Sequence, residues 1–147
     1  MKLSSKGRYG ARLMLELALH YDKGPVLLKD IAKRQEISEK YLGHLVPPLK
    51  AAGLISASRG AHGGYTLARP PQKITLGDIV QAVEGSLNMV ECLSSAQVCP
   101  RVGLCVTRDV WRQLSLKIKE VLDSKNLAEM AEQQREKQKL QPCVYSI

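Results

Sequence analysis

The sequence contains no phenylalanine and a single tryptophan among its 147 residues, so aromatic rings cannot dominate its core. Hydrophobic residues still make up 44% of the chain, and most of them are aliphatic. Leucine and alanine favour helices more than sheets. We therefore expect a mainly α-helical protein, and the length favours one domain or a compact head with a dimerising extension.

Long hydrophobic runs are also missing. No stretch of 18 apolar residues occurs, so no segment is expected to span a membrane. Residues 1–10 are polar and lack the apolar stretch of a signal peptide. These absences predict a cytoplasmic protein, and in that reducing compartment its four cysteines are expected to bind metal or carry out redox chemistry.

Acidic residues are scarce in the first half of the chain. Residues 1–69 hold twelve Lys and Arg against five Asp and Glu, whereas residues 70–147 hold ten against nine. The first half therefore carries seven of the eight excess positive charges. This asymmetry predicts a head that binds a polyanion, although charge alone also allows a merely solvated basic surface.

Apolar periodicity and capping residues predict the order of the elements. The expected helices are 5–21, 28–35, 38–46, 76–84, 106–124 and 127–139, and the expected strands are 55–58 and 65–67. Pro47 and Pro48 are expected to end the third helix early, near Val46, or to kink it. Glu36 lies in the turn before this helix, and holding this L-residue in the left-handed backbone region would cost about 1 kcal/mol.

Residues 28–50 have the pattern of a helix-turn-helix, with Ala32 at the helix crossing and Ile37 in the turn. The second helix of such a motif presents its first side chains to base edges in the major groove of DNA. The predicted base-facing or phosphate-contacting residues of this helix are Ser38, Lys40, Tyr41 and His44.

The hairpin after this motif resembles a wing. Arg59 and Gly60 lie at its tip, where glycine permits close backbone approach and the guanidinium can enter a narrow minor groove. Lys6, Arg8 and Lys50 are expected to add phosphate contacts. The fold is therefore predicted to be mainly α with a small β-hairpin wing, and its partner to be double-stranded DNA. A helical hairpin and turn used only for packing is the alternative.

Three cysteines, Cys92, Cys99 and Cys105, lie in residues 85–105, a segment without sustained periodicity. Their spacing is too wide for the paired knuckles of a zinc ribbon but leaves slack for three thiolates to surround one polynuclear cluster. Arg101 and Arg108 would offset the negative charge of such ligands. Zinc, or three unrelated free thiols, remain alternatives.

The helix that follows carries apolar residues at three- and four-residue spacing, as expected of a helix that packs along a partner helix. These residues are Val110, Trp111, Leu114, Ile118, Val121 and Leu122. We therefore divide the chain into a winged helix-turn-helix domain (1–84), a cysteine-rich loop (85–105) and a dimerisation helix with a C-terminal tail (106–147).

The chain resembles the IscR-type iron–sulfur cluster regulators and their nitric-oxide-sensing and cysteine-metabolism relatives. The resemblance covers the chain to about residue 130 and is carried by residues 3–10, 24–26, 37–38, 41–42, 53–55, 59–60, 63–65, 82–84, 105–107 and 111 together with the three cysteines. It implies a homodimer, a palindromic operator, and a 2Fe–2S or 4Fe–4S cluster on the cysteine loop whose occupancy alters DNA binding. The implied target genes serve cluster biogenesis or sulfur and redox stress.

One residue departs from this resemblance. Close relatives have a histidine ligand three residues after the last cysteine, but Arg108 occupies that position and has no lone pair for a metal. The fourth ligand is therefore open among Asp109, Cys143, a side chain of the partner's first helix, and solvent. Other relatives use an acidic residue near position 8 of the partner subunit. This chain has Arg8 there, and Glu16 is the acidic residue within its first helix.

Two other functions compete. A cluster-free winged-helix regulator could sense a thiol metabolite, a partner enzyme or oxidation through its cysteines. A small cluster-carrier or redox protein could use the basic head to dock an acidic partner. An enzyme is not expected, because the sequence has no P-loop, dinucleotide fingerprint or Ser/His/Asp arrangement.

Overall fold

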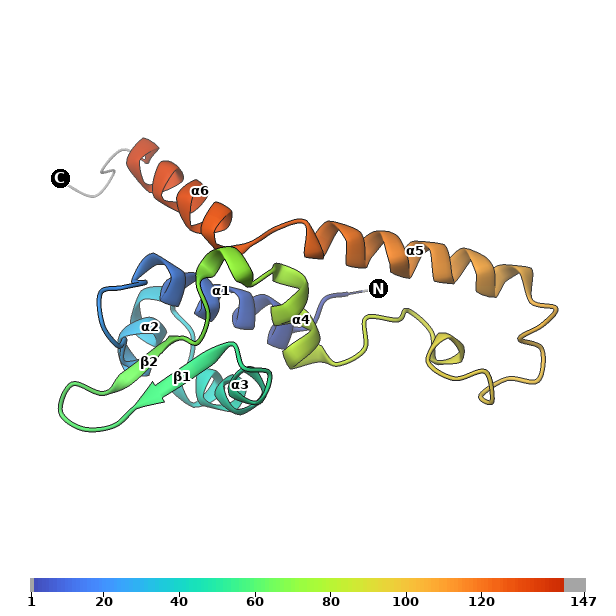
Figure 1. The fold of residues 1–147 in the computed structure, drawn as a ribbon, viewed down its shortest axis with the longest axis horizontal. Coiled ribbons are helices and arrows are strands. Elements are labelled where there is room, and N and C mark those ends of the chain that lie inside the picture. The colour runs from blue at the N-terminus through green and yellow to red at the C-terminus, as the bar shows by residue number, and fades with distance from the viewer. Residues whose placement is uncertain (1, 142–147) are drawn as a thin grey trace.

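The computed structural model describes residues 2–141 and consists of a helical head from which a long arm projects (Figure 1). The element order is α1 (Ser5–Leu19), α2 (Leu28–Gln35), α3 (Glu39–Ala51), β1 (Ile55–Ser58), β2 (Gly64–Leu67), η1 (Pro71–Lys73), α4 (Leu76–Glu84), η2 (Glu91–Leu93), α5 (Val106–Asp123) and α6 (Leu127–Leu140). The predicted mainly α fold with one small hairpin is confirmed. Within residues 2–141, no helix is both long and apolar enough to cross a membrane.

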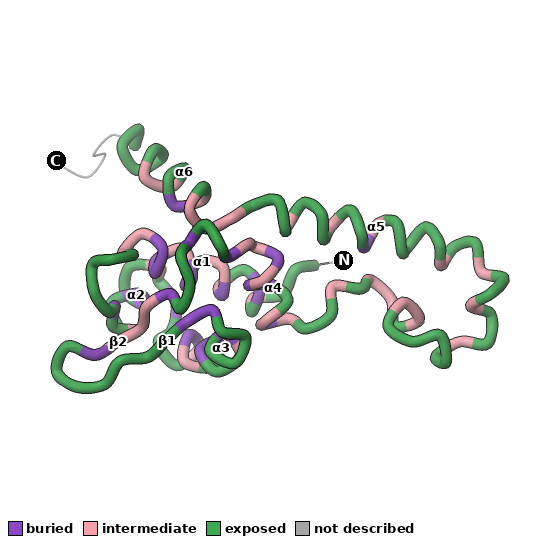
Figure 2. Tube along the Cα trace, in the orientation of Figure 1, coloured by how far each residue is buried: buried purple, intermediate pink, exposed green. Residues whose placement is uncertain are grey.

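The hydrophobic core lies in the head, where the buried segments gather, whereas the arm is largely exposed (Figure 2). Aliphatic side chains from five helices are almost fully buried there, among them Leu13, Met14, Ile31, Leu42, Leu49, Ile79 and Leu127. Leu127 and Ala131 of α6 belong to this core, so α6 folds back onto α1 instead of trailing from the arm.

Side-chain caps begin the helices where the sequence predicts. Ser4 accepts a hydrogen bond from the amide of Lys6 at 3.1 Å, and Ser38 accepts one from the amide of Tyr41 at 3.2 Å. Thr75 and Asp78 form a reciprocal capping box at the start of α4. Each cap satisfies an amide that has no partner within its helix, which is why these local signals are reliable.

The turn between α2 and α3 has the predicted left-handed residue. Glu36 ends α2 with φ 54° and ψ 43°. Ile37 is buried beside it, and its amide donates to the carbonyl oxygen of Ala32 at 3.0 Å. Burial of Ile37 holds the two helices of the helix-turn-helix together and offsets the cost of the Glu36 backbone.

The prediction that Pro47 and Pro48 end the third helix was wrong, because both lie inside α3, which continues to Ala51. Proline lacks an amide hydrogen, so two intrahelical hydrogen bonds cannot form at these positions. The helix persists because Leu45 and Val46 before the prolines, and Leu49 after them, are all buried against the core. The first helix is also shorter than expected and ends at Leu19 instead of Tyr21.

The wing is an antiparallel pair of strands in which Ile55 faces Leu67 and Ser58 faces Gly64. A third segment extends it, because Val26 and Tyr65 exchange backbone hydrogen bonds of 2.9 and 2.8 Å. Gly64 has a φ of 145°, and a Cβ added there would lie 2.6 Å from the carbonyl oxygen of Val26. Only glycine permits this close approach of the wing to the head.

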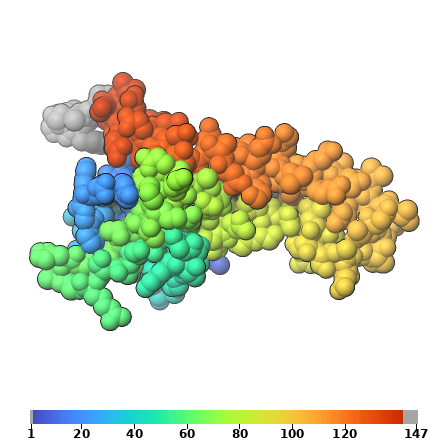
Figure 3. Space-filling model, in the orientation of Figure 1, coloured from blue at the N-terminus to red at the C-terminus, as the bar shows by residue number. Residues whose placement is uncertain are grey.

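The arm combines α5 with the cysteine loop, residues 85–105, which lies against α5 at the end of the molecule remote from the wing (Figure 3). Ser115, the buried residue of α5, accepts a hydrogen bond from the amide of Met89 at 3.1 Å. The loop is therefore attached to the helix that connects it to the head.

Candidate nucleic-acid interface and cysteine loop

The start of α3 presents the polar side chains that the sequence predicts as DNA contacts. Ser38, Lys40 and His44 are exposed, and Lys40 and His44 share one face of the helix because they are four residues apart. Lys50 is exposed in the last turn of the same helix. The wing lies on the same side of the head as α3 (Figure 1). The structure therefore brings these two predicted contact elements to one surface.

Tyr41 has a more structural position than the sequence predicts. It is half-buried, and its ring packs edge-on against Tyr9 of α1 with 5.5 Å between ring centroids. The guanidinium carbons of Arg8 and Arg12 lie 5.4 and 5.5 Å from the centroid of the Tyr9 ring. This cation–aromatic cluster joins the basic start of α1 to the start of α3. Tyr9 and Arg12 were not among the site residues predicted from the sequence. Tyr9 and Arg12 are three residues apart in a predicted helix, and this spacing could have indicated that their side chains lie together.

The turn of the wing is tight and leaves Arg59 exposed. The amide of Gly63 donates to the carbonyl oxygen of Gly60 at 3.0 Å. A Cβ at position 63 would lie 2.5 Å from the carbonyl oxygen of Ser58, so the turn closes only around glycine. Lys6 and Arg8 are likewise exposed, in the first turns of α1.

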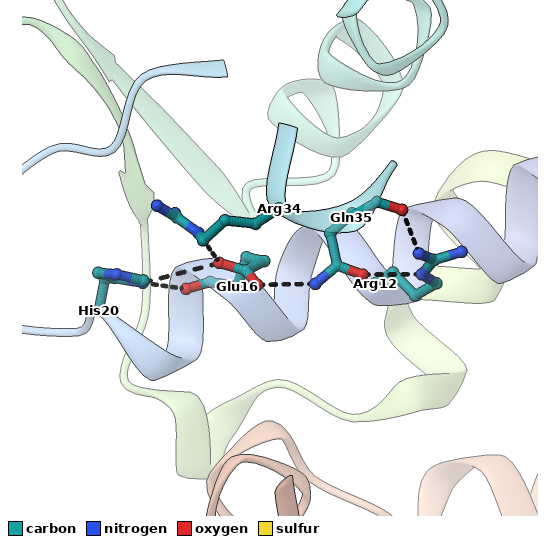
Figure 4. A network of polar contacts seen from close by, with 5 residues as sticks. All are labelled: Arg12, Glu16, His20, Arg34 and Gln35. Atoms are coloured by element: carbon teal, nitrogen blue, oxygen red, sulfur yellow. Dashed lines mark hydrogen bonds and ion pairs between the residues drawn. The ribbon is translucent and has the colours of Figure 1, made fainter. Parts of the chain in front are cut away.

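A buried carboxylate fixes α2 against α1 (Figure 4). Glu16 accepts hydrogen bonds from Arg34 Nε at 2.9 Å and from Gln35 Nε2 at 2.7 Å. Arg12 in turn donates to the side chain and carbonyl of Gln35. His20 Nδ1 lies 2.9 Å from the carbonyl oxygen of Glu16. Because both carboxylate oxygens of Glu16 are engaged inside the head, Glu16 is not available as a metal ligand.

The three cysteines of the loop are partly exposed free thiols. Within the part of the chain that the structure describes, no three His, Cys, Asp or Glu side chains are gathered closely enough to hold a metal ion. The loop would therefore have to rearrange for its cysteines to converge. Cys143, the tail residue considered as a fourth ligand, lies outside the described residues.

Cys105 differs from an ordinary thiol because it is the N-cap residue of α5. Its Sγ lies 3.2 Å from the hydroxyl oxygen of Thr107. Hydrogen bonds from the Thr107 hydroxyl and then from the Arg108 backbone amide lower the pKa of Cys105. A thiolate is thus favoured where this helix begins, which suits a metal ligand or a reactive sulfur.

The side chain of Arg108 contacts the cysteine loop. Its Nη2 and Nε donate to the carbonyl oxygen of Cys92 at 3.1 and 3.3 Å. Asp109, the neighbouring candidate ligand, is exposed and pairs with Arg112 at 3.3 Å. The position at which the resemblance expects a histidine ligand therefore holds a residue that attaches the loop to α5.

The apolar residues of α5 divide between two faces. Ile118 and Leu122 face the head and line a hollow with Val80 of α4. On the other side, Val110 is 50% exposed and Val121 is 60% exposed. The predicted apolar stripe thus packs partly within the chain and leaves an uncovered face with Val110 and Val121, and Val106, Trp111 and Leu116 are further exposed apolar residues of α5.

Known proteins share both the sequence and this architecture. Residues 3–133 match the family model Rrf2, described as an iron-dependent transcriptional regulator. The HTH-type transcriptional regulator IscR of Aliivibrio salmonicida (strain LFI1238) is 42% identical over 130 residues, which are 88% of this chain and 77% of that protein.

Two solved structures are also similar. The structure of CymR, the global cysteine regulator of B. subtilis, has a TM-score of 0.75 at 42% identity and covers 90% of this chain and 97% of its own. The IscR of T. potens has a TM-score of 0.78 at 44% identity, covering 96% and 93%. These neighbours confirm the predicted winged-helix fold and the resemblance to IscR-type regulators. The chain belongs to the Rrf2 family of transcriptional regulators.

Proposed function

We propose that this regulator reads duplex DNA through α3 and the wing. The observation that carries the proposal is that α3, with Lys40 and His44 exposed, and the wing, with Arg59 exposed, lie on the same side of the head. An α-helix fits the major groove, and an arginine at a glycine-rich tip fits the minor groove. Lys6, Arg8 and Lys50 would hold the phosphates at the margins.

The acting unit is a homodimer joined along α5. Val110, Leu116 and Val121 would be unusually exposed for large apolar side chains unless a partner covered them. A second α5 crossing the first would present two copies of α3 to DNA, roughly 34 Å apart if they meet successive turns of one groove. Two-fold symmetry of the protein then requires a palindromic operator.

The finer part of the proposal is an iron–sulfur cluster, 2Fe–2S or 4Fe–4S, on the cysteine loop. Three free thiols, one with a lowered pKa, form a donor set that suits such a cluster. Cys92, Cys99 and Cys105 would hold it, and Asp109, Cys143, the partner subunit or solvent would complete the ligands. A bound cluster would supply a redox-sensitive group. The match to an iron-dependent family supports this assignment.

The arm provides a route from the loop to the head. Arg108 and Ser115 attach the loop to α5, and Ile118 and Leu122 attach α5 to the head. Ordering or release of the loop would shift α5 and with it the angle between the two heads of a dimer. A coupling of about 1–3 kcal/mol is typical of such switches and would change DNA affinity by up to about a hundredfold.

The test is anaerobic purification with iron and sulfide analysis, followed by genomic DNA capture and affinity measurement. We expect wild type to retain iron and sulfide, Cys92→Ala to lose them, and the two to differ in operator affinity. Cys143→Ala tests the tail thiol, because loss of iron in this variant would identify Cys143 as the fourth ligand and retained iron would exclude it. Equal DNA affinity with and without the cluster would exclude a sensing role for the cluster but would not argue against DNA binding.

A cluster-free regulator is the second candidate, and two observations favour it. The three cysteines do not converge among the described residues, and the chain is as similar to CymR, a cysteine regulator, as to IscR. In this case Cys105 would react with a thiol metabolite or an oxidant. Colourless protein without iron after anaerobic purification, combined with DNA affinity that changes on oxidation, would support this candidate over the first.

If the protein were a cluster carrier or a redox protein, neither α3 nor the wing would contact DNA. Failure of every genomic fragment to bind at low ionic strength would favour that function. Because a transcriptional regulator acts on the chromosome, we place the protein in the cytoplasm. We assign it no catalytic site.

A further inference from the structure

A hollow of about 520 Å³ lies on the flank of the head, beside the wing turn. The segment between α1 and α2, the outer face of α2 and the wing turn line it. Four of its side chains carry or can acquire positive charge: His20, Lys23, Arg34 and His62. Asp30 is the one acidic side chain among its lining residues. None of these five charged or ionisable residues is among the predicted DNA contacts or the predicted cysteine ligands.

Arg34 is held in place for a ligand. The buried carboxylate of Glu16 accepts from its Nε at 2.9 Å, while the Arg34 side chain remains 42% exposed. Among the described residues, no protein acceptor is paired with its two Nη atoms. A guanidinium presents these donors in one plane, the geometry that binds both oxygens of a carboxylate or phosphate. The ion pair with Glu16 already orders the Arg34 side chain, so binding a ligand would cost little further conformational entropy.

His20 is oriented by the same residue. Its Nδ1 lies 2.9 Å from the carbonyl oxygen of Glu16, and a carbonyl oxygen only accepts, so Nδ1 carries the hydrogen. Nε2 is then the ring nitrogen left for another partner, and in the imidazolium form of the ring it carries a hydrogen that can be donated to an oxyanion. Figure 4 shows the imidazole of His20 and the guanidinium of Arg34 at the same end of the Glu16 carboxylate, whereas Gln35 approaches its other end.

We propose that this hollow binds an oxyanion, a phosphate or carboxylate group, between Arg34, His20, Lys23 and His62. Lys29 and Lys33 are exposed on the same helix but do not line this hollow, so the hollow gathers a particular subset of the basic side chains. His62 belongs to the wing turn, and Tyr65 just beyond it pairs with Val26 of the head. An anion in the hollow would therefore bridge the wing and the body of the head.

Two sources can supply this chemistry: a backbone phosphate of bound DNA, or a free small anion that sets the position of the wing. The first source depends on the DNA-binding function proposed above, whereas the second does not. The experiment therefore has one arm without DNA and one arm with it, so that failure of the site and failure of DNA binding give different results.

The first arm titrates inorganic phosphate into the full-length protein and follows the ring resonances of its histidines by NMR. We expect saturable shifts of His20 and His62. Lys23→Gln and His62→Gln, both at exposed positions, should weaken binding about three- to fivefold. Lys33→Gln is the matched control and should bind as wild type does. No saturable shift, or equal weakening by Lys23→Gln and Lys33→Gln, would overturn the proposal.

The second arm measures affinity for a captured genomic duplex against salt concentration. If a DNA phosphate occupies the hollow, Lys23→Gln lowers the salt slope by about 1 and inorganic phosphate competes with the duplex. If a free anion occupies it, the slope is unchanged, and saturating phosphate alters the DNA affinity of wild type but not of Lys23→Gln. An unchanged slope without any specific effect of phosphate would overturn both sources.

Discussion

Arg108 donates two hydrogen bonds to the carbonyl oxygen of Cys92, from Nη2 at 3.1 Å and from Nε at 3.3 Å. The residue that departs from the IscR-type ligand pattern therefore has a defined role, which is to attach the cysteine loop to α5. This contact also places the first and last cysteines of the loop near the same helix end, because Cys105 caps α5 three residues before Arg108.

Arg108→His should strengthen metal retention if the loop holds a cluster. The imidazole would restore a nitrogen ligand at the position where the resemblance expects one, whereas arginine cannot coordinate. We expect more iron and sulfide per chain and slower loss in air than in wild type. Arg108→Ala, which removes the contact without adding a ligand, is the control. Equal iron content in all three proteins would show that this position is not beside the metal.

Thr107→Val should make Cys105 less reactive near neutral pH. The hydroxyl of Thr107 is the largest cause of the lowered pKa, so its removal raises the pKa and reduces the thiolate fraction at a given pH. The midpoint of the rate of alkylation of Cys105 against pH, measured by mass spectrometry on metal-free protein, should move to higher pH. Thr66→Val in β2 is the control. An unmoved midpoint would contradict the hydrogen bond.

Gly64→Ala should displace the wing. A Cβ at this position would lie 2.6 Å from a carbonyl oxygen of the head, and φ of 145° is unfavourable for alanine. We expect a loss of about 1–3 kcal/mol of unfolding free energy and a marked loss of DNA affinity. Gly103→Ala, where a Cβ would meet nothing within 4 Å, is the control. Chemical denaturation and fluorescence anisotropy measure the two effects, and unchanged DNA affinity would argue against a role for the wing.

Val110→Asp should dissociate the dimer. The side chain is half-exposed on the uncovered face of α5, so the change should be tolerated by a single chain but would bury a charge between two chains. Sedimentation should show a monomer with helical content intact and weaker operator binding. Leu140→Asp, at an exposed leucine of α6, should remain dimeric. A dimeric Val110→Asp protein would place the interface elsewhere.

Glu16→Gln should destabilise the head by about 1–3 kcal/mol, because it removes the charge that pairs with Arg34 inside a buried network. Glu120→Gln breaks the exposed pair with Lys117 and should cost less than about 1 kcal/mol. Thermal and chemical denaturation measure the difference. Equal effects of the two substitutions would mean that the Glu16 network contributes no more than a surface ion pair.

The sequence by itself determined the features that depend on residues close together in the chain. Ser38 and Thr75 cap helices because the amides they satisfy lie three residues away. The turn of the wing, Gly60–Gly64, follows from the backbone freedom of its glycines. The bounds of α2 and of the two wing strands, and the start of α3, could therefore be predicted nearly correctly.

Only the tertiary structure decided the features that depend on distant contacts. Burial of Leu49 carries α3 past Pro47 and Pro48, against the local preference of proline. The partners of Arg108 and Arg34 lie 16 and 18 residues away in sequence, so no local pattern could reveal which atoms these side chains meet. Packing and charge pairing act through space, and their outcome is set only when the chain has folded.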